Sequence, residues 1–70
     1  MGLSEMKIEY NKLLKRYHDA EKYFSKNNIG FEEKMKFYPD FQEVLKALNH
    51  YLGEIKKYEK VSSEQILGGF

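Results

Sequence analysis

The chain has 70 residues, and its 12 Lys and Arg against 11 Asp and Glu give a formal net charge of +1 at pH 7. This near-neutral balance excludes a strong overall attraction to nucleic acid or to anionic lipid. A chain this short forms one small domain, residues 1–70, and buries only about 60–65% of the surface that its unfolded form exposes. With no Cys and only two His, it has neither disulfides nor enough ligands for a convincing structural metal site. We therefore expect self-association or partner binding to supplement its small core.

The first predicted element is a helix over residues 4–26. Ser4 is its expected N-cap, and the Asn and Gly of residues 27–30 are expected to end it. Apolar side chains recur four and three residues apart for about two and a half heptads, which is too short for a free-standing coiled coil and favours one helix of a packed hairpin. The members of this stripe are Leu3, Met6, Tyr10, Leu13, Leu14, Tyr17, Ala20 and Phe24.

A short helix over residues 31–38 is expected next, and Pro39 follows it. Within a continuous helix, the proline ring would clash with the carbonyl of Met35 at a cost of about 3 kcal/mol. Proline is well placed, however, at the first position of a new helix. The sequence therefore favours a break at Pro39, and a kinked continuous helix over residues 31–59 is the alternative.

Residues 40–59 have the longest helical apolar rhythm in the chain. Their apolar side chains cover an arc of roughly 140°, which is wider than one neighbouring helix covers. The rest of the chain is expected to pack around this amphipathic helix. Its apolar members are Phe41, Val44, Leu45, Leu48, Tyr51, Leu52, Ile55 and Tyr58.

Ser62 and Gln65 have the spacing of a capping box, which predicts a helical turn over residues 63–67. Ile66, Leu67 and Phe70 are too apolar for a free tail, so this segment is expected to dock on the helices or on another molecule. The predicted fold is all-α: an antiparallel hairpin of two long helices, with a short connecting helix and a short C-terminal turn.

Basic side chains gather on the outer face of the first helix, where Tyr23 also projects, a pattern that can hold a phosphate backbone and stack a base. Acidic side chains lie among them, and residues 1–28 contain six basic and four acidic side chains. A solvated helix face is therefore favoured, and weak nucleic-acid binding without sequence specificity is the alternative. The basic residues are Lys12, Lys15, Arg16, Lys22 and Lys26.

No constellation of side chains indicates catalysis or a cofactor. His50 and Glu54 have the four-residue spacing of a helical metal chelate, but no third ligand accompanies them. His18 and Asp19 are adjacent, so on a helix they diverge by about 100° and cannot orient one another. We expect no enzyme activity, no cofactor and no metal.

Aromatic residues are unusually frequent, with six Tyr and five Phe. A tyrosine at the rim of a core can keep its hydroxyl in water, which suits an interface. The expected function is a non-catalytic interaction module that binds another protein or, preferably, itself as a homodimer. Its expected contacts are Tyr51, Tyr58, Ile66 and Phe70. No apolar run reaches the length of a membrane span, and a cysteine-free chain without a secretory signal fits the cytoplasm.

Two runs resemble small phage- and prophage-type helical proteins of Gram-positive bacteria: Tyr-Pro-Asp-Phe-Gln-Glu-Val-Leu over residues 38–45 and Glu-Gln-Ile-Leu-Gly-Gly-Phe over residues 64–70. Those proteins end similarly, in an acidic residue, two aliphatic residues, glycine and phenylalanine. The resemblance covers about half of the chain. No activity is assigned to such proteins, so the resemblance implies a setting and no mechanism.

Overall fold

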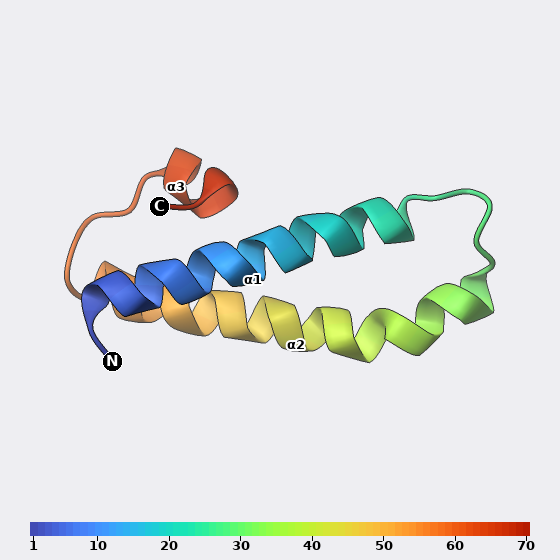
Figure 1. The fold of residues 1–70 in the computed structure, drawn as a ribbon, viewed down its shortest axis with the longest axis horizontal. Helices are drawn as coiled ribbons and strands as arrows, with labels where there is room; N and C mark the ends of the chain where they lie inside the picture. The colour runs from blue at the N-terminus through green and yellow to red at the C-terminus, as the bar shows by residue number, and fades with distance from the viewer.

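The computed structural model describes residues 1–70 and contains three helices and no strand. α1 (Leu3–Phe24) and α2 (Phe31–Lys56) pack antiparallel, and the short α3 (Ser63–Gly68) lies beside α1 near the end that holds both termini (Figure 1). The molecule is a rod with extents of 42 × 20 × 14 Å. The predicted all-α antiparallel hairpin is confirmed.

α1 begins at Leu3, so the prediction that Ser4 caps it is wrong. Gly2 is the N-cap, and its carbonyl accepts a hydrogen bond of 3.0 Å from the N–H of Met6. Extending the helix to Leu3 brings that side chain against the core, a gain that a cap at Ser4 would forgo. The helix ends at Phe24, two residues earlier than predicted, where the Ser25 hydroxyl donates to the carbonyl of Lys22 at 3.0 Å.

α2 runs through Pro39, so the predicted break is wrong and the alternative of one continuous helix is right. Its first turns bend relative to the rest of the helix (Figure 1), as proline causes inside a helix. Aromatic contacts on both sides of Pro39 offset the lost backbone hydrogen bond: the rings of Tyr23 and Phe37 lie 5.5 Å apart, and those of Phe24 and Phe41 lie 5.2 Å apart. These contacts hold both segments of α2 against α1.

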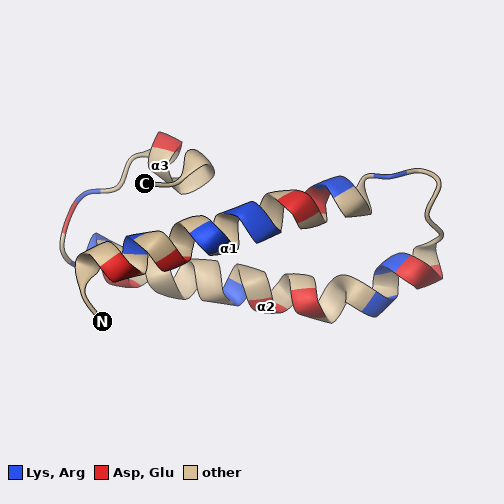
Figure 2. Cartoon of the chain, viewed as in Figure 1, with Lys and Arg blue, Asp and Glu red and all other residues tan.

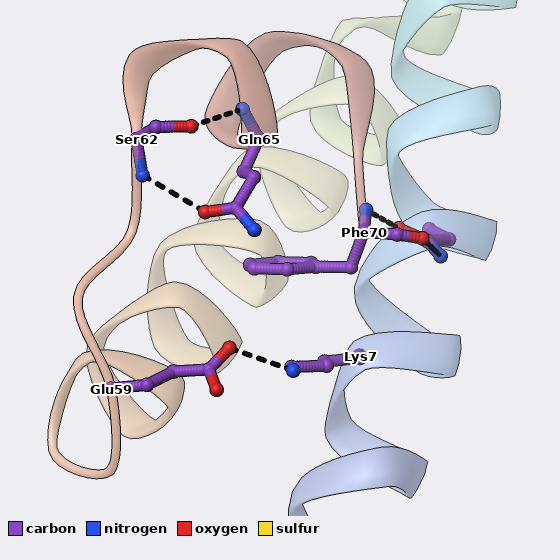
Figure 3. Close-up of polar contacts among 6 residues, drawn as sticks. Lys7, Glu59, Ser62, Gln65 and Phe70 are labelled. Carbon is purple, nitrogen blue, oxygen red and sulfur yellow. Dashed lines mark hydrogen bonds and ion pairs between the residues drawn. The ribbon is translucent and has the colours of Figure 1, made fainter.

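The other end of α2 lies three residues before the predicted one. The helix closes at Lys56 with a tighter final turn, in which the N–H of Tyr58 donates to the carbonyl of Ile55 at 3.0 Å. This turn directs the chain back toward α1. α3 then begins as predicted, with the complete Ser62–Gln65 capping box, and ends at Gly68 (Figure 3).

The core is small and lies at one end of the rod. Leu48 and Ile55 are buried, as predicted, and Leu45 and Leu52 are half-buried. None of residues 15–47 is buried, so the half of the hairpin beside the α1–α2 connection has no closed interior. The buried side chains are Met6, Tyr10, Leu14, Leu48 and Ile55.

Acidic and basic side chains are interspersed along both long helices (Figure 2). Lys7 Nζ lies 2.7 Å from Glu59 Oε1 and ties α1 to the segment after α2, whereas the other ion pairs join residues three positions apart. Such surface pairs each contribute about 0–1 kcal/mol. The charges therefore do not determine how the helices pack. Neither long helix has an uninterrupted apolar stretch sufficient to cross a membrane, and nor does α3.

Candidate interaction surface

Aromatic side chains gather at the end of the hairpin beside the α1–α2 connection. Their rings contact one another across the two helices, Tyr23 with Phe37 and Phe24 with Tyr38 and Phe41. Within α2, Tyr38 also contacts Phe41. All of these ring centroids are 5.2–6.2 Å apart, within the range in which aromatic pairs attract. We call this cluster the aromatic end; it consists of Tyr23, Phe24, Phe31, Met35, Phe37, Tyr38 and Phe41.

The aromatic end is unusually exposed for such apolar side chains. Phe31 is 75% exposed, Phe37 48%, Tyr38 42% and Met35 39%. With about 200 Å² of surface per side chain of this size, these four expose roughly 400 Å². Phe37 contributes this surface on one side of the hairpin end, and Phe31, Met35 and Tyr38 contribute it on the other. Exposed apolar surface of a few hundred Å² is often functional.

Two open grooves flank the Phe24–Phe41 contact. The groove on one side has a volume of about 350 Å³ and a floor of aromatic rings, with Arg16, Asp19 and Asp40 as its charged members. No carboxylate lies within ion-pairing distance of the Arg16 guanidinium. The apolar residues of this groove are Ala20, Tyr23, Phe24, Phe37, Phe41 and Val44.

The groove on the other side has a volume of about 500 Å³ and includes the most exposed ring, Phe31. Its charged members are Glu21 and Lys34. The aromatic end thus combines protruding rings with adjacent hollows, the arrangement needed for interlocking with another apolar surface. The apolar residues of this groove are Tyr17, Phe24, Phe31, Met35, Tyr38 and Phe41.

The aromatic end is uncovered because the third layer of the fold is short. α3 and the residues that follow it lie along the part of α1 nearest the termini, as far as His18, whose Nε2 lies 3.1 Å from the carbonyl oxygen of Leu67, and do not reach the aromatic end (Figure 1). The apolar stripe of α1 nevertheless continues through Tyr17, Ala20 and Phe24. The sequence therefore supplies an apolar face for the whole hairpin and a cover for only half of it.

The contacts expected from the sequence lie at the opposite end of the rod. Tyr51, Ile66 and Phe70 are half-buried, and Tyr51 and Phe70 pack against the chain's own core. Tyr58 follows the end of α2 and is 66% exposed. The structure thus brings Ile66 and Phe70 onto α1 within one chain. Of the four expected contact residues, Tyr58 is the one that remains freely accessible.

The aromatic end was missed in the sequence because the expected break at Pro39 separated its members. On one continuous helix, Phe37 and Tyr38 precede Phe41 by four and three residues, so each can pack beside Phe41, one on either side of it. A reading of residues 31–59 as one helix would have extended the apolar stripe to Phe31. The number of aromatic residues before Pro39 was the available signal.

The five basic side chains singled out in the sequence, four on α1 and Lys26 just after it, are all exposed. Lys12 Nζ lies 3.5 Å from Glu9 Oε1, and no carboxylate lies within 4 Å of the other four basic groups. Asp19, also exposed, lies among them, and Figure 2 shows acidic segments between the basic ones on α1. The face therefore has a mixed rather than a uniformly positive charge.

The histidines do not assemble a metal site, since no group of three or more potential ligands comes together. Glu54 lies beside Lys57, whose Nζ donates a hydrogen bond of 3.0 Å to Glu54 Oε1, and this bond lowers the pKa of the carboxyl. The pair therefore stabilises the fold fully at pH values above the ordinary pKa of a glutamate carboxyl. This stabilisation is lost as the pH falls through the lowered pKa of Glu54.

Residues 62–70, which we call the tail, dock on α1 mainly through their backbone. The Tyr10 hydroxyl donates to the carbonyl of Ile66 at 2.6 Å, and the ring of Phe70 lies between α3 and the Lys7–Glu59 pair (Figure 3). His18 Nε2 lies 3.1 Å from the carbonyl oxygen of Leu67. The tail therefore folds back onto its own chain, one of the two outcomes expected from the sequence.

Replacing Tyr10 with Phe tests this docking. The ring remains in the core while the carbonyl of Ile66 loses its donor, so the free energy of unfolding should fall by about 1–2 kcal/mol. Burial raises the pKa of Tyr10, and only the neutral hydroxyl donates. The hydrogen bond from Tyr10 therefore contributes fully to stability at pH values below the ordinary tyrosine pKa of about 10. This contribution is lost as the pH rises through the raised pKa of Tyr10.

Urea unfolding of wild type and Tyr10→Phe, at neutral pH and through the alkaline range, measures both effects. Tyr58→Phe is the matched control, because Tyr58 is exposed and no hydrogen bond to its hydroxyl is present. The difference in free energy of unfolding between Tyr10→Phe and Tyr58→Phe should become smaller at high pH. Equal stability of both variants at neutral pH would contradict the role given to the Tyr10 hydroxyl.

No protein-family model matches this chain, and no curated protein or solved structure matches it either.

Proposed function

We propose that this protein is a non-catalytic interaction module that self-associates through the aromatic end. The observation that carries the proposal is the uneven cover of the hairpin. The tail shields the apolar face at one end, whereas Phe31, Phe37 and Tyr38 stay exposed at the other. The proposal keeps the homodimer expected from the sequence and places the contact surface at the opposite end of the rod.

The charges around the aromatic end favour a second copy as the partner. Residues 15–42 contain six basic and five acidic side chains, so two copies of this surface do not repel one another through net charge. In a two-fold dimer, the same patch on each copy must complement itself. A nearly balanced mixture of both signs meets that condition.

Shape supports the same partner. An apolar cavity of about 150 Å³ is enough to hold a benzene ring, so the groove of about 350 Å³ can take the exposed Phe31 ring of a second copy. The roughly 400 Å² exposed by the four most accessible side chains is about half of one partner's share of a standard interface. The half-buried rings beside them supply further area.

Sedimentation at micromolar concentrations tests the proposal. Wild type should be a dimer, and a Phe31→Asp/Phe37→Asp double variant should be a monomer, because charged groups would have to be buried without partners. Loss of two central aromatic contacts should weaken association at least about thirtyfold. Tyr58→Asp, which alters an exposed ring outside this surface, should remain a dimer.

Two results would contradict this assignment. A wild-type chain that stays monomeric throughout the micromolar range would remove self-association. Dissociation by Tyr58→Asp, with no effect of the Phe31→Asp/Phe37→Asp change, would return the contact to the surface expected from the sequence. Circular dichroism of each variant verifies that the helices are retained.

Nucleic-acid binding by the basic face of α1 is the second candidate. The observation in its favour is that Lys15, Arg16, Lys22 and Lys26 are exposed and free of ion pairs. Binding of labelled DNA or RNA that weakens with added salt would support it. Absence of binding at low salt would remove it.

A further inference from the structure

The tail is held by a pattern of contacts that selects its sequence. Asn11 is the central residue: its Oδ1 accepts a hydrogen bond of 2.7 Å from the N–H of Phe70, and its Nδ2 donates one of 3.1 Å to the backbone oxygen of Phe70. One side-chain amide thus satisfies both backbone groups of a single residue. This pairing fixes the position of the peptide on α1 without using a tail side chain.

The residue before Phe70 must be glycine. Gly69 has φ 89° and ψ −178°, a conformation that essentially only glycine adopts. A Cβ at this position would lie 2.5 Å from Asn11 Oδ1. Asn11 cannot move away without breaking its bonds to Phe70, so any side chain here would displace the peptide.

The residue after that glycine is selected by an aromatic contact. The Phe70 ring lies 5.4 Å from the Tyr10 ring at an interplanar angle of 71°, an edge-to-face arrangement. Lys7 Nζ lies 5.5 Å from the centre of the Phe70 ring, within the range of a cation–π contact. α1 therefore selects two neighbouring tail positions: one that must lack a side chain, Gly69, and one that must carry an aromatic ring, Phe70.

From these contacts we infer that Lys7, Tyr10 and Asn11 form a binding site for a peptide with glycine followed by an aromatic residue. The tail is the resident ligand of this site. A peptide of the same chemistry, supplied by another molecule, occupies the site when the tail is released. This site lies at the opposite end of the rod from the aromatic end, so it does not depend on self-association.

The helical turn of the tail is stabilised within the tail itself and does not require contact with α1. Its capping box is internal, because Ser62 and Gln65 bond to one another (Figure 3), and none of the side chains of α3 is buried. A short non-helical connection joins it to α2. Because the tail is covalently joined to α2, its effective concentration at the site is in the millimolar range. A free peptide therefore competes poorly with it until the tail leaves the site.

The test uses the full chain with Gly69→Ala, which should release the tail. The probe is a fluorescent peptide of residues 62–70 with the wild-type sequence, and its anisotropy reports binding. The variant chain should bind this peptide at least about tenfold more tightly than the wild-type chain does, because the resident competitor is gone. The same peptide carrying Gly69→Ala should not bind.

Gly68→Ala is the matched control, because a Cβ at Gly68 meets nothing within 4 Å. That chain should keep its tail docked, with the amide of Phe70 protected from hydrogen exchange, and should bind the peptide as weakly as wild type. Adding Asn11→Ala to the Gly69→Ala chain should abolish peptide binding. Phe70→Ala provides a second chain with a released tail, should Gly69→Ala impair folding.

The inference is overturned if the released chains retain their helices yet fail to bind the wild-type peptide. Equal binding of the wild-type and Gly69→Ala peptides would also overturn it, because the site would then not select glycine. Measurement on the Phe31→Asp/Phe37→Asp background separates this outcome from self-association, since peptide binding should be unchanged there.

Discussion

Replacing Ile55 with Ala should lower the free energy of unfolding by about 2–5 kcal/mol. Ile55 is fully buried, with 0% of its surface exposed, and it lies where α2 packs against α1. A domain of this length is expected to have a total stability of only about 4–10 kcal/mol. The variant should therefore be largely unfolded well below the wild-type melting temperature.

Ile8→Ala is the matched control for this substitution. It makes the same change within a long helix, but Ile8 is 52% exposed, so its cost should stay within about 0.5 kcal/mol. Urea titrations followed by circular dichroism compare the two variants directly. Equal losses at both positions would show that the interior does not lie between Met6, Tyr10, Leu48 and Ile55.

Pro39→Ala should raise the free energy of unfolding by about 2 kcal/mol. Pro39 lies within α2 and is exposed, so the change restores a backbone donor for the carbonyl of Met35 and removes the clash of the ring, together worth about 3 kcal/mol. The greater freedom of the unfolded chain without proline takes back about 0.4–1 kcal/mol. Thermal and urea unfolding measure the net gain.

The same change should also weaken self-association. The bend at Pro39 sets the direction of the first turns of α2, which carry Phe31 and Phe37, and a straighter helix would move those rings relative to α1. Gly53→Ala is the control: it stabilises a helix interior by about 1 kcal/mol at a position with open space around it. A Pro39→Ala chain that is less stable than wild type would contradict this account of α2.

The fold could be predicted largely from local patterns. Apolar spacing identified both long helices, and the capping box identified the start of α3, because both signals lie within a few residues of one another. Pro39 was misjudged because its local cost of about 3 kcal/mol is offset by tertiary contacts of Phe37 and Phe41 with α1. Tertiary contacts of Leu3 similarly moved the start of α1 away from Ser4.

The candidate surfaces were harder to predict, because they depend on which segments meet. Whether an apolar face is covered depends on how far the tail reaches along α1, and no local pattern gives that distance. The role of Asn11 was likewise invisible, since its partner Phe70 lies 59 positions later in the chain. The apolar character of Ile66 and Phe70 indicated that this segment docks, but the sequence left open whether it docks on its own helices or on another molecule.

The position of the core at the far end from the α1–α2 connection has a consequence for the order of folding. Met6, Tyr10 and Leu14 meet Leu48 and Ile55, so the most buried contacts close the longest loops and must bear the largest loss of chain entropy. The rings near the connection close short loops instead. We expect α1 and α2 to pair first beside their connection and then progressively toward the termini. The exposed aromatic end would then form first and the buried core last.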